Sequence, residues 1–544
     1  MSLKKSHVLA AGVAVLLAGS LATYLYFRNL AAKVSKPLGS AKIIPASALM
    51  TAFMTPNSEA LDQLQELGTP EAQRLIAGGW QEIERETLAE TNISYEKDLR
   101  PWVGSIAMAA IPTENSESLE SVDVLFLIGI KNKIKAWNFV NKLEGNEKVK
   151  VEEKEYKGVK VWEVTEPNAQ TYNSAVLGDY LAVSETFGAI TEAIDTFQGE
   201  PSLASQADAA AIYSKSAGVK NPVFTLFVPD YAGLIKQLNA NMSQGEQLSP
   251  STLNSLNSVK SLVMGIGVDD AGVRMRSVSK LNAPVLENLQ PIPGKLLTRF
   301  PVETIALFSG GNISQVWSYF VRQAQSDPTL SMGLDLMRQG FTANGLDVDR
   351  EIFGWMDGEI VMGAIASDEG LLGQIGVGGA FLWETSDRST AETFFNKLDA
   401  IASKSPQVSL RKAKIDGKEV TQWQVLGLGT FGGHGWLDDN TVFIAAGEPI
   451  LELMATGVSD PLNRSSSFKE ITGSLPQQNQ GYFYLDMDRA VSWLERYPYA
   501  TSYGYISPET LVVLNSIRGI GLTVVWPDDL TSEIEMVWAL KSLE

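Results

Sequence analysis

The sequence contains no cysteine, and only His7 and His434 supply an imidazole group in 544 residues. Disulfide bonds, thiolate metal sites and cysteine nucleophiles are therefore excluded. A zinc site is excluded as well, because it needs three or four nitrogen or sulfur ligands. These absences predict no catalytic, cofactor-binding or metal-binding residues, and we expect the protein not to be an enzyme.

Basic residues are also scarce. The chain holds 44 Lys and Arg against 63 Asp and Glu, a formal net charge of −19 at pH 7. Residues 1–36 contain five of the basic residues and no acidic one, so the rest of the chain is more acidic than the total suggests. A surface of this sign repels phosphate groups, which argues against nucleic acid as a partner and against charge-driven binding to an anionic bilayer.

Long apolar runs are absent except for one near the N-terminus. Residues 8–27 carry no charge and are long enough to cross a hydrocarbon core of about 30 Å as a helix. Tyr24 and Phe27 precede Arg28, as in an interfacial aromatic belt with a cationic stop. We expect an uncleaved transmembrane signal anchor after a tail of residues 1–7, with a cleaved signal peptide as the alternative. The large domain would then lie outside the cytoplasm, in the periplasm or the thylakoid lumen.

The chain does contain a phrase that occurs twice. The phrase at 137–143 returns at 392–398, a separation of 255 residues, and both copies share Asn-Lys-Leu. A similar separation relates Leu256-Asn257-Ser258 to Leu514-Asn515-Ser516. We therefore expect an α+β protein with two tandem homologous copies, each a mainly antiparallel sheet of about seven or eight strands with inserted helices. The predicted tail, transmembrane anchor, tether, first copy, linker and second copy are residues 1–7, 8–27, 28–41, 42–281, 282–298 and 299–544.

Local patterns predict where several elements begin and end. Tyr156–Val159 and Ile415–Lys418 each place a glycine where a hairpin turn requires one. Ser389 and Glu392 predict a capping box at the start of the second repeated helix. Asp327-Pro328 predicts a break between two helices. Asp pairs are favoured at hairpin tips, and they occur at 269/270, 438/439 and 528/529.

Two short phrases carry a family resemblance. Trp102-Val103-Gly104 in the first copy corresponds to Trp355–Gly358 in the second, and both copies carry Phe-x-Asn-Lys-Leu. Together with the N-terminal anchor and the acidic, cysteine-free body, these phrases resemble a family of uncharacterised membrane-anchored proteins known mainly from cyanobacteria. The resemblance covers nearly the whole chain. It implies a thylakoid, plasma-membrane or periplasmic setting, and it implies no chemistry and no site residues.

Motifs for catalysis or ligand binding are weak. Gly427–Gly432 fits G-x-G-x-x-G, but the residues after it indicate a turn and a strand, whereas a dinucleotide site requires a helix. We interpret this segment as a flexible hairpin loop, and His434 beyond it as an exposed loop residue. Asp347-Val348-Asp349 begins like a calcium loop, but Glu351 and Ile352 stand where the next ligand and the glycine should be.

The two copies differ most in the loop before Ser507. The second copy has four tyrosines in residues 497–505, whereas the first copy has the polar run 239–247. Tyrosine is amphipathic and loses little side-chain entropy, so it is enriched at contact surfaces. Binding to a partner and packing on the protein itself are both open. The candidate partner-binding residues are Trp493, Tyr497, Tyr499, Tyr503 and Tyr505.

These patterns lead to an expected function. We expect a membrane-anchored binding or scaffolding protein outside the cytoplasm, whose partner is another membrane or envelope protein. The alternative is a carrier or sensor of a small hydrophobic molecule, for which an apolar cavity in both copies would be evidence. A hydrolase is the least expected class. No G-x-S-x-G or phosphate-binding loop occurs, and a Ser-His-Asp triad would have to use His434.

Overall fold

The structure is a computed structural model that describes most of the chain between residues 37 and 543. The residues that it leaves undescribed are 1–36, 55–56, 76–94, 113–121, 145–149, 166–170, 207–217, 241, 243–246, 250–251, 254–255, 285–289, 326, 498–506 and 544. The predicted tail and signal anchor, residues 1–7 and 8–27, therefore lie outside the described residues. Among the helices that are described, none is long and apolar enough to cross a membrane.

The contacts within the chain divide it into two units, which we call unit 1 and unit 2. Unit 1 contains residues 1–248, 255–282 and 542–544, and unit 2 contains residues 249–254 and 283–541. The main division, after Asn282, falls at the beginning of the predicted linker. Each unit is built from an antiparallel sheet with helices, so the α+β prediction is confirmed.

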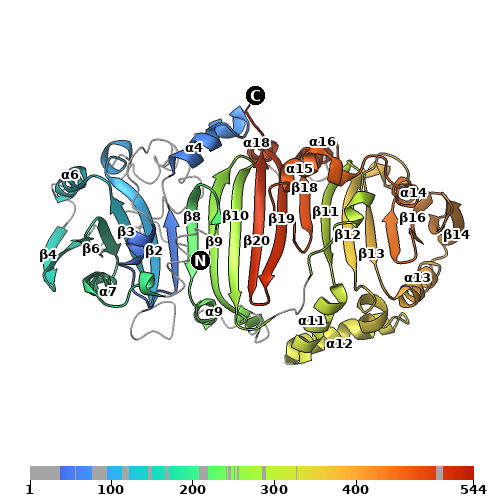
Figure 1. The fold of residues 1–544 in the computed structure, drawn as a ribbon, viewed down its shortest axis with the longest axis horizontal. Coiled ribbons are helices and arrows are strands. Elements are labelled where there is room, and N and C mark those ends of the chain that lie inside the picture. The colour runs from blue at the N-terminus through green and yellow to red at the C-terminus, as the bar shows by residue number, and fades with distance from the viewer. Residues whose placement is uncertain are drawn as a thin grey trace. The chain divides into compact units, whose positions relative to one another are not determined.

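Unit 1 has ten strands in its described residues (Figure 1). They lie in the order β4-β5-β6-β7-β3-β2-β1-β8-β9-β10, and every neighbouring pair is antiparallel. The strands are β1 Met50–Met54, β2 Val103–Pro112, β3 Val122–Ile130, β4 Lys150–Tyr156, β5 Val159–Thr165, β6 Thr171–Leu177, β7 Tyr180–Ser184, β8 Pro222–Val228, β9 Val259–Asp269 and β10 Gly272–Leu281. The main helices are α3 Pro37–Ala41, α4 Ser58–Gln65, α6 Lys133–Glu144, α7 Phe187–Gln198 and α9 Tyr231–Ala240.

Unit 2 also has ten strands in its described residues, in the order β14-β15-β16-β17-β13-β12-β11-β18-β19-β20. The strands are β11 Thr304–Gly311, β12 Glu359–Ala366, β13 Val377–Glu384, β14 Val408–Ile415, β15 Lys418–Val425, β16 Gly429–Trp436, β17 Thr441–Ala446, β18 Tyr482–Asp486, β19 Ile517–Asp528 and β20 Thr531–Leu540. The main helices are α11 Ile313–Gln325, α12 Pro328–Thr342, α13 Arg388–Ala402, α14 Glu448–Thr456, α15 Ser466–Thr472, α16 Met487–Arg496 and α18 Pro508–Ser516. Counted along the chain, the strands of the two units follow the same order.

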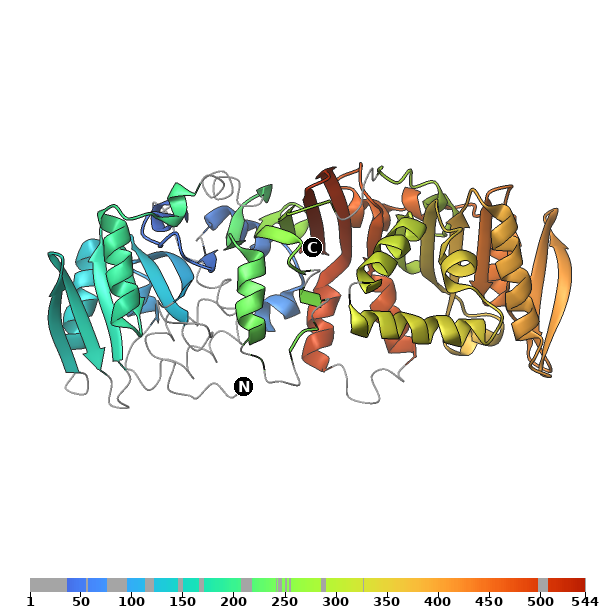
Figure 2. The ribbon, with the colours of Figure 1, turned by 90° about the horizontal axis from the view of Figure 1, so that it is seen from below.

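The core of each unit lies between its sheet and short helices. In unit 1, α7 packs on β3, β6 and β7 and buries Ile190 and Ile194 completely. In unit 2, α14 packs on β13, β16 and β17, and α15 packs on β18, β19 and β20, which buries Leu451 and Ile471. Full burial of such side chains stabilises each unit by roughly 1.5–3 kcal/mol apiece. Figure 2 shows α11 and α12, in yellow, which pack against each other.

The repeated phrase is helical in both units, as predicted, because it lies in α6 and in α13. In α13, Phe394 is partly buried and its ring lies 5.9 Å from that of Trp355. In α6, Phe139 is partly buried and its ring lies 5.5 Å from that of Trp102. Phe139 and Phe394 are 255 residues apart, as the repeat requires, and each packs against the tryptophan of the paired Trp-containing phrase.

Both predicted hairpin turns are confirmed. Lys157 and Gly158, between β4 and β5, have φ angles of 48° and 80°, and Asp416 and Gly417, between β14 and β15, have 47° and 78°. Two consecutive residues with positive φ form a type I′ turn, whose twist matches that of the flanking strands. Glycine is favoured at the second position because it adopts this conformation without steric cost.

Other local predictions have mixed outcomes. The break at Asp327-Pro328 is confirmed, since α11 ends before it and α12 begins at the proline. The capping box is wrong. Asp387 is the N-cap of α13 and accepts the backbone N–H of Thr390 at 3.0 Å, whereas Glu392 pairs with a neighbouring arginine. The aspartate precedes the helix directly, so it reaches the free backbone N–H groups that Ser389, already inside the helix, cannot cap.

The strand count is also corrected, from seven or eight to ten in the described residues of each unit. In unit 1, for example, β6 and β7 are separate strands joined by a turn at Gly178, whose φ is 65°. Gly429–Gly432, interpreted as part of a flexible hairpin loop, and His434, interpreted as a loop residue, belong to β16. The strands β4 and β14 stand at one end of their sheets. β14 exposes Arg411, Lys412 and Lys414, and β4 exposes the mixed run 152–155.

Candidate functional site

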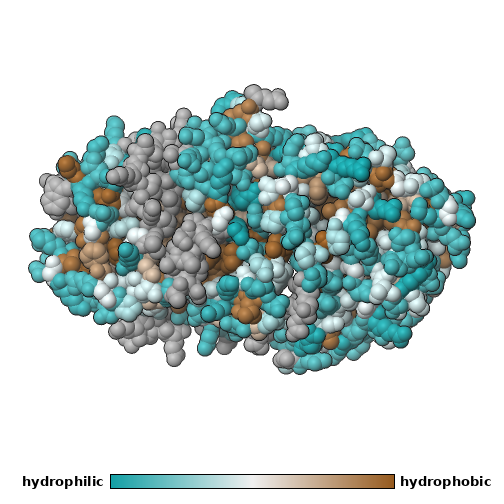
Figure 3. All heavy atoms as spheres, in the orientation of Figure 1, coloured by the Kyte–Doolittle hydropathy of each residue, from teal (hydrophilic) through white to brown (hydrophobic). Residues whose placement is uncertain are grey.

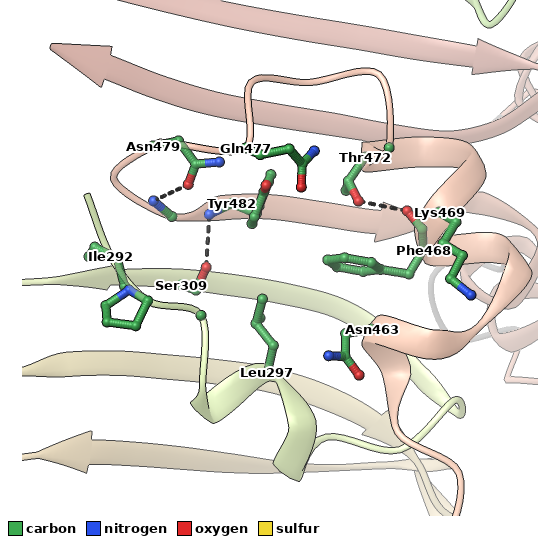
Figure 4. Close-up of a pocket in the computed structure, with 14 residues that line it drawn as sticks. Ile292, Leu297, Ser309, Asn463, Phe468, Lys469, Thr472, Gln477, Asn479 and Tyr482 are labelled. Carbon is green, nitrogen blue, oxygen red and sulfur yellow. Dashed lines mark hydrogen bonds between the residues drawn. The ribbon is translucent and has the colours of Figure 1, made fainter. Parts of the chain in front are cut away.

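Unit 2 contains a cavity of about 280 Å³ beside β11 and β18 (Figure 4). Four separate stretches of the chain line it: residues 292–297, Ser309 of β11, residues 463–473 and residues 477–482. The volume lies just below the range of about 300–1,000 Å³ that is typical of pockets for drug-sized ligands. A ligand of this cavity would therefore be small.

Hydrogen bonds hold the polar wall of the cavity in place. Asn479 accepts the backbone N–H of Gly481 through Oδ1 at 2.8 Å and donates Nδ2–H to the carbonyl of Pro476 at 2.5 Å. Ser309 Oγ accepts the backbone N–H of Tyr482 at 2.8 Å, and Figure 4 shows this bond as a dashed line. Burial raises the pKa of the Tyr482 phenol, so its hydroxyl stays neutral at physiological pH.

The opposite wall combines apolar groups with one amide. Leu297, Asn463 and Phe468 converge on the cavity in Figure 4. Phe468 is 7% exposed, and its ring meets the Tyr482 ring edge-on at 6.0 Å. Oδ1 of Asn463 is shielded from solvent and has no hydrogen-bond partner in the described part of the chain. Among the described lining residues none is acidic, and Lys469 is the only charged one.

A second feature of unit 2 is a row of exposed apolar side chains on the sheet. Phe308 of β11 lies opposite Met362 of β12, which in turn lies opposite Phe381 of β13. Directly paired residues of antiparallel strands share a face, so these three side chains stand next to one another. Their exposed fractions are 42%, 40% and 45%. We call Phe308, Met362 and Phe381 the apolar row.

The residues that alternate with the apolar row are buried. Leu307, Val361 and Leu382 are at most 2% exposed and belong to the core under α14 and α15. The same three strands therefore present one face to the core and large apolar side chains to solvent on the other. Hydrophilic residues dominate the surface in Figure 3, and hydrophobic residues form separate patches between them.

The structure places two of the five candidate loop residues. Trp493, in α16, donates its Nε1–H to the carbonyl of Ile375 at 2.8 Å. The hydroxyl of Tyr497 donates to the carbonyl of Gly373 at 3.2 Å. Both side chains therefore pack on the segment that precedes β13, which for these two residues favours internal packing over partner binding. Tyr499, Tyr503 and Tyr505 lie outside the described residues.

The interpretation of His434 as an exposed loop residue is wrong. It lies in β16, is 8% exposed, and its Nε2 lies 3.0 Å from Oδ1 of Asp399. Its ring stacks on Phe395 at 4.7 Å, and Asp399 also accepts the Nε1–H of Trp423 at 2.8 Å. In the described part of the chain Asp399 is the only side chain hydrogen-bonded to His434. The pair is therefore a buried hydrogen bond within the core of unit 2.

The remaining motifs have structural roles in unit 2. Gly427, in the turn before β16, and Gly429, the first residue of β16, have positive φ, so the glycine fingerprint leads into a strand and not into a helix. Asp349, in the poor calcium motif, accepts from Arg338 Nε at 2.8 Å and from Trp317 Nε1 at 2.9 Å. Within the described residues there is no group of three His, Cys, Asp or Glu that could hold a metal ion.

Neither the cavity nor the apolar row is predicted by the sequence analysis. The row leaves a weak signal, because residues 305–308 are apolar at positions that point to both faces, whereas a strand with one solvated face alternates. The cavity leaves none, since its walls come from stretches up to about 190 residues apart that only tertiary folding brings together.

Comparison with solved structures finds distant matches to the protein TP0453. Its crystal form IV matches with a TM-score of 0.27 and 8% identity, covering 45% of this chain and 83% of that chain. Its crystal form III matches with a TM-score of 0.27 and 8% identity, covering 46% of this chain and 82% of that chain. These values are too low to support a comparison of function. No curated protein matches.

A family model matches residues 8–540, which is nearly the entire chain. Its description is a protein of unknown function, DUF3352. The match begins at the predicted anchor and extends through both units, which confirms the expectation of an uncharacterised family. Membrane anchoring and a cyanobacterial distribution remain predictions. The chain belongs to the DUF3352 family of proteins of unknown function.

Proposed function

We propose that this protein is a binding or scaffolding protein that contacts another protein through the apolar row of unit 2. The observation that carries the proposal is the side-by-side exposure of Phe308, Met362 and Phe381 on three neighbouring strands. Single exposed apolar residues are ordinary, but contiguous ones mark interaction surfaces. Burying the exposed part of each side chain would stabilise a complex by on the order of 1 kcal/mol.

The apolar row is also conformationally ordered before it binds. The Phe381 ring stacks on Trp383 at 5.7 Å, and Trp383 itself belongs to an aromatic cluster that includes buried Trp355. The Phe308 ring lies over Gly310, where an added Cβ would be 3.4 Å from it. Side chains that are already held in one position lose little entropy on association, which favours binding.

Site-specific photo-crosslinking tests this proposal. A benzoylphenylalanine introduced at Phe381 in the full chain, in its native membranes, should form a discrete adduct with a second protein. The change Phe308→Thr with Met362→Thr should abolish that adduct, because it removes the apolar surface while keeping residues that favour strands.

Leu410 supplies the matched control. It lies on β14, is 40% exposed, and is four strands away from β13 in the sheet order. A crosslinker at this position should give no adduct of the same mass. The proposal fails if Phe381 gives no protein adduct, or if Leu410 gives the same adduct with equal yield.

We further propose that residues 8–27 anchor the protein in a membrane, with both units outside the cytoplasm and an envelope or thylakoid protein as the partner. The length of the uncharged run supports this location. Alkaline extraction should leave the full chain in the membrane fraction, and protease added from the extracytoplasmic side should degrade both units. Release by alkali, or protection from that protease, would contradict the location.

The undescribed part of the loop remains a proposed second contact with the partner. Tyr499, Tyr503 and Tyr505 lie within eight residues after Tyr497, whose hydroxyl donates to the carbonyl of Gly373 in unit 2. Replacing these three tyrosines by serine should weaken recovery of the partner that is crosslinked from Phe381. Unchanged recovery would remove the loop from the interface and leave the apolar row as the contact.

The common strand order supports a proposal about the origin of the chain, namely that units 1 and 2 are duplicated copies. The helices α6 and α13 follow the third strand of their units, and the type I′ turns join the fourth strand to the fifth. An experimental structure should superpose the two sheets strand for strand and place Asn141 on Asn396. A shift by one residue or more in that alignment would contradict duplication with the repeated phrase in register.

A further inference from the structure

The cavity of unit 2 lies on the other face of the sheet from the apolar row. Ser309, which lines the cavity, directly follows Phe308 of the row in β11, and neighbouring side chains of a strand point to opposite faces. The cavity therefore belongs to the side that α15 covers, where Phe468 and Lys469 of that helix line it. A ligand of the cavity would bind independently of a protein at the apolar row.

Asn463 indicates what kind of group the cavity can bind. Its carboxamide forms no hydrogen bond with the described residues, although Oδ1 is shielded from solvent. The other amide on this wall, Asn479, has both its oxygen and its nitrogen paired. Rotation about the terminal torsion of asparagine is easy, so either atom of the Asn463 carboxamide can turn towards the cavity. Buried polar groups are normally paired, and an unpaired one beside a cavity points to a bound molecule.

The rest of the lining defines the other parts of that molecule. Leu297 and Phe468 provide an apolar surface next to Asn463, as Figure 4 shows. The described lining contains no carboxylate that could neutralise a cation, and the nearby Lys469 repels one. The composition of the lining therefore selects against positively charged ligands, although the chain as a whole is acidic.

We infer that the cavity is a binding site for a small uncharged molecule that carries an amide group on a compact apolar body. The apolar body packs between Leu297 and Phe468. The amide carbonyl accepts from Nδ2 of Asn463, and the amide N–H donates to Oδ1. A pair of hydrogen bonds of this kind satisfies both unpaired atoms of one side chain at once.

Three probes with the same ring test the assignment. Benzamide both donates and accepts, methyl benzoate only accepts, and benzylammonium is a cation that only donates. Binding to the full chain in lipid nanodiscs is measured by saturation-transfer NMR with a concentration series. Benzamide should bind about tenfold more tightly than methyl benzoate, which leaves one atom of Asn463 unpaired. Benzylammonium should bind most weakly. Equal binding of benzamide and methyl benzoate would overturn the inference.

Two substitutions at one position should change the preference in different directions. Asn463→Leu removes both hydrogen-bonding atoms, so benzamide should lose its advantage over methyl benzoate. Asn463→Asp adds a carboxylate, so benzylammonium should become the tightest probe. Asn440→Leu is the matched control, because Asn440 is exposed in the turn between β16 and β17, away from the cavity. It should leave the order of the three probes unchanged.

Folding of each variant is checked by its thermal unfolding. If Asn463→Leu does not fold, the result with Asn463→Asp decides, and an unchanged probe order in a folded variant would contradict the inference. The variant Phe381→Thr separates this site from the proposed protein contact. This variant should bind benzamide as the natural protein does. The proposal for the cavity and the proposal for the apolar row can therefore fail separately.

Discussion

Units 1 and 2 share a strand order but differ on the open face of the sheet. In unit 2 the apolar row begins with Phe308, and the corresponding first strand of unit 1 has Ala52, opposite Met108. Met108 in turn lies opposite Phe126, which is only 8% exposed, compared with 45% for Phe381. One unit folds with this order without an exposed aromatic row, which indicates that the row of unit 2 is not a requirement of the fold.

A second difference concerns an aspartate before a helix. Asp230 follows β8 and accepts the backbone N–H of Gly233 at 2.9 Å, while its residue is exposed. Asp486 is the last residue of β18 and accepts the backbone N–H of Arg489 at 3.1 Å, but it is completely buried. The same capping interaction is therefore exposed to solvent in unit 1 and buried in unit 2. Its loss should lower the free energy of unfolding far more in unit 2.

The largest expected effect comes from that pair of aspartates. Asp486 also accepts from Ser467 Oγ at 2.5 Å and from the hydroxyl of Tyr484 at 3.2 Å. Asp486→Ala should destabilise unit 2 by about 3–5 kcal/mol, because it breaks a buried charged network. Asp230→Ala should cost about 1 kcal/mol in unit 1, the usual value for an N-cap. Denaturant-dependent hydrogen exchange, read separately for each unit, measures both, and similar costs would refute the distinction.

The next effect compares the two faces of one strand. Leu307→Ala should destabilise unit 2 by about 2–5 kcal/mol, because Leu307 is 2% exposed and its removal leaves a cavity in the core. Phe308→Ala should cost about 1 kcal/mol or less, since a large part of its ring is already in water. Urea unfolding of the two variants provides the measurement. A large cost for Phe308→Ala would mean that the apolar row supports the fold and is not free for a partner.

Unit 1 should become more stable as the pH rises between about 8 and 10.5, because of Lys131. Burial, with the nearby charges of Arg100 and Lys135, lowers the pKa of Lys131 from 10.5 to about 8. Between these values the unfolded chain binds a proton that the folded unit does not, so stability rises with pH from about 8 to 10.5. Below pH 8 the full penalty for the buried ammonium is present. In Lys131→Met the rise should disappear. Hydrogen exchange of unit 1 across this pH range is the measurement, and an identical slope in the variant would contradict it.

The smallest effect should be equal in the two units. Gly158 and Gly417 have φ angles of 80° and 78°, and a Cβ added at either would meet no atom within 4 Å. Replacement by alanine should therefore cost only the backbone strain, about 1 kcal/mol at each site. Unequal losses in thermal unfolding would show that the two turns are not equivalent.

Local patterns predicted those elements whose chemistry is contained in a few residues. The type I′ turns need only a pair such as Lys157-Gly158, and the helix break needs only Asp327-Pro328. The repeated helices were found because similar residues must face similar cores. In each case the physical cause lies within one short stretch, so the sequence alone is informative.

The wrong predictions concern residues whose structure depends on contacts with distant parts of the sequence. Gly432 and Gly433 suggested a loop, but they allow neighbouring strands to approach closely. A Cβ added at Gly432 would lie 2.3 Å from the carbonyl oxygen of Ala445, and one added at Gly433 would lie 2.2 Å from that of Thr421. His434 was misplaced with them, because Asp399 is 35 residues away in sequence. The cavity could not be predicted for the same reason, since Asn463 and Leu297 meet only after folding.

The terminal strand β14 has a consequence for how the protein behaves when it is crowded. A free strand edge is a template on which the strand of another molecule can add, which is how sheets grow into fibrils. Arg411, Lys412 and Lys414 are exposed on this edge, so the same strand of a second molecule would bring three positive charges against three. Mutual repulsion should therefore keep two β14 edges from pairing, and unit 2 resists polymerisation at this end even where many molecules are concentrated together.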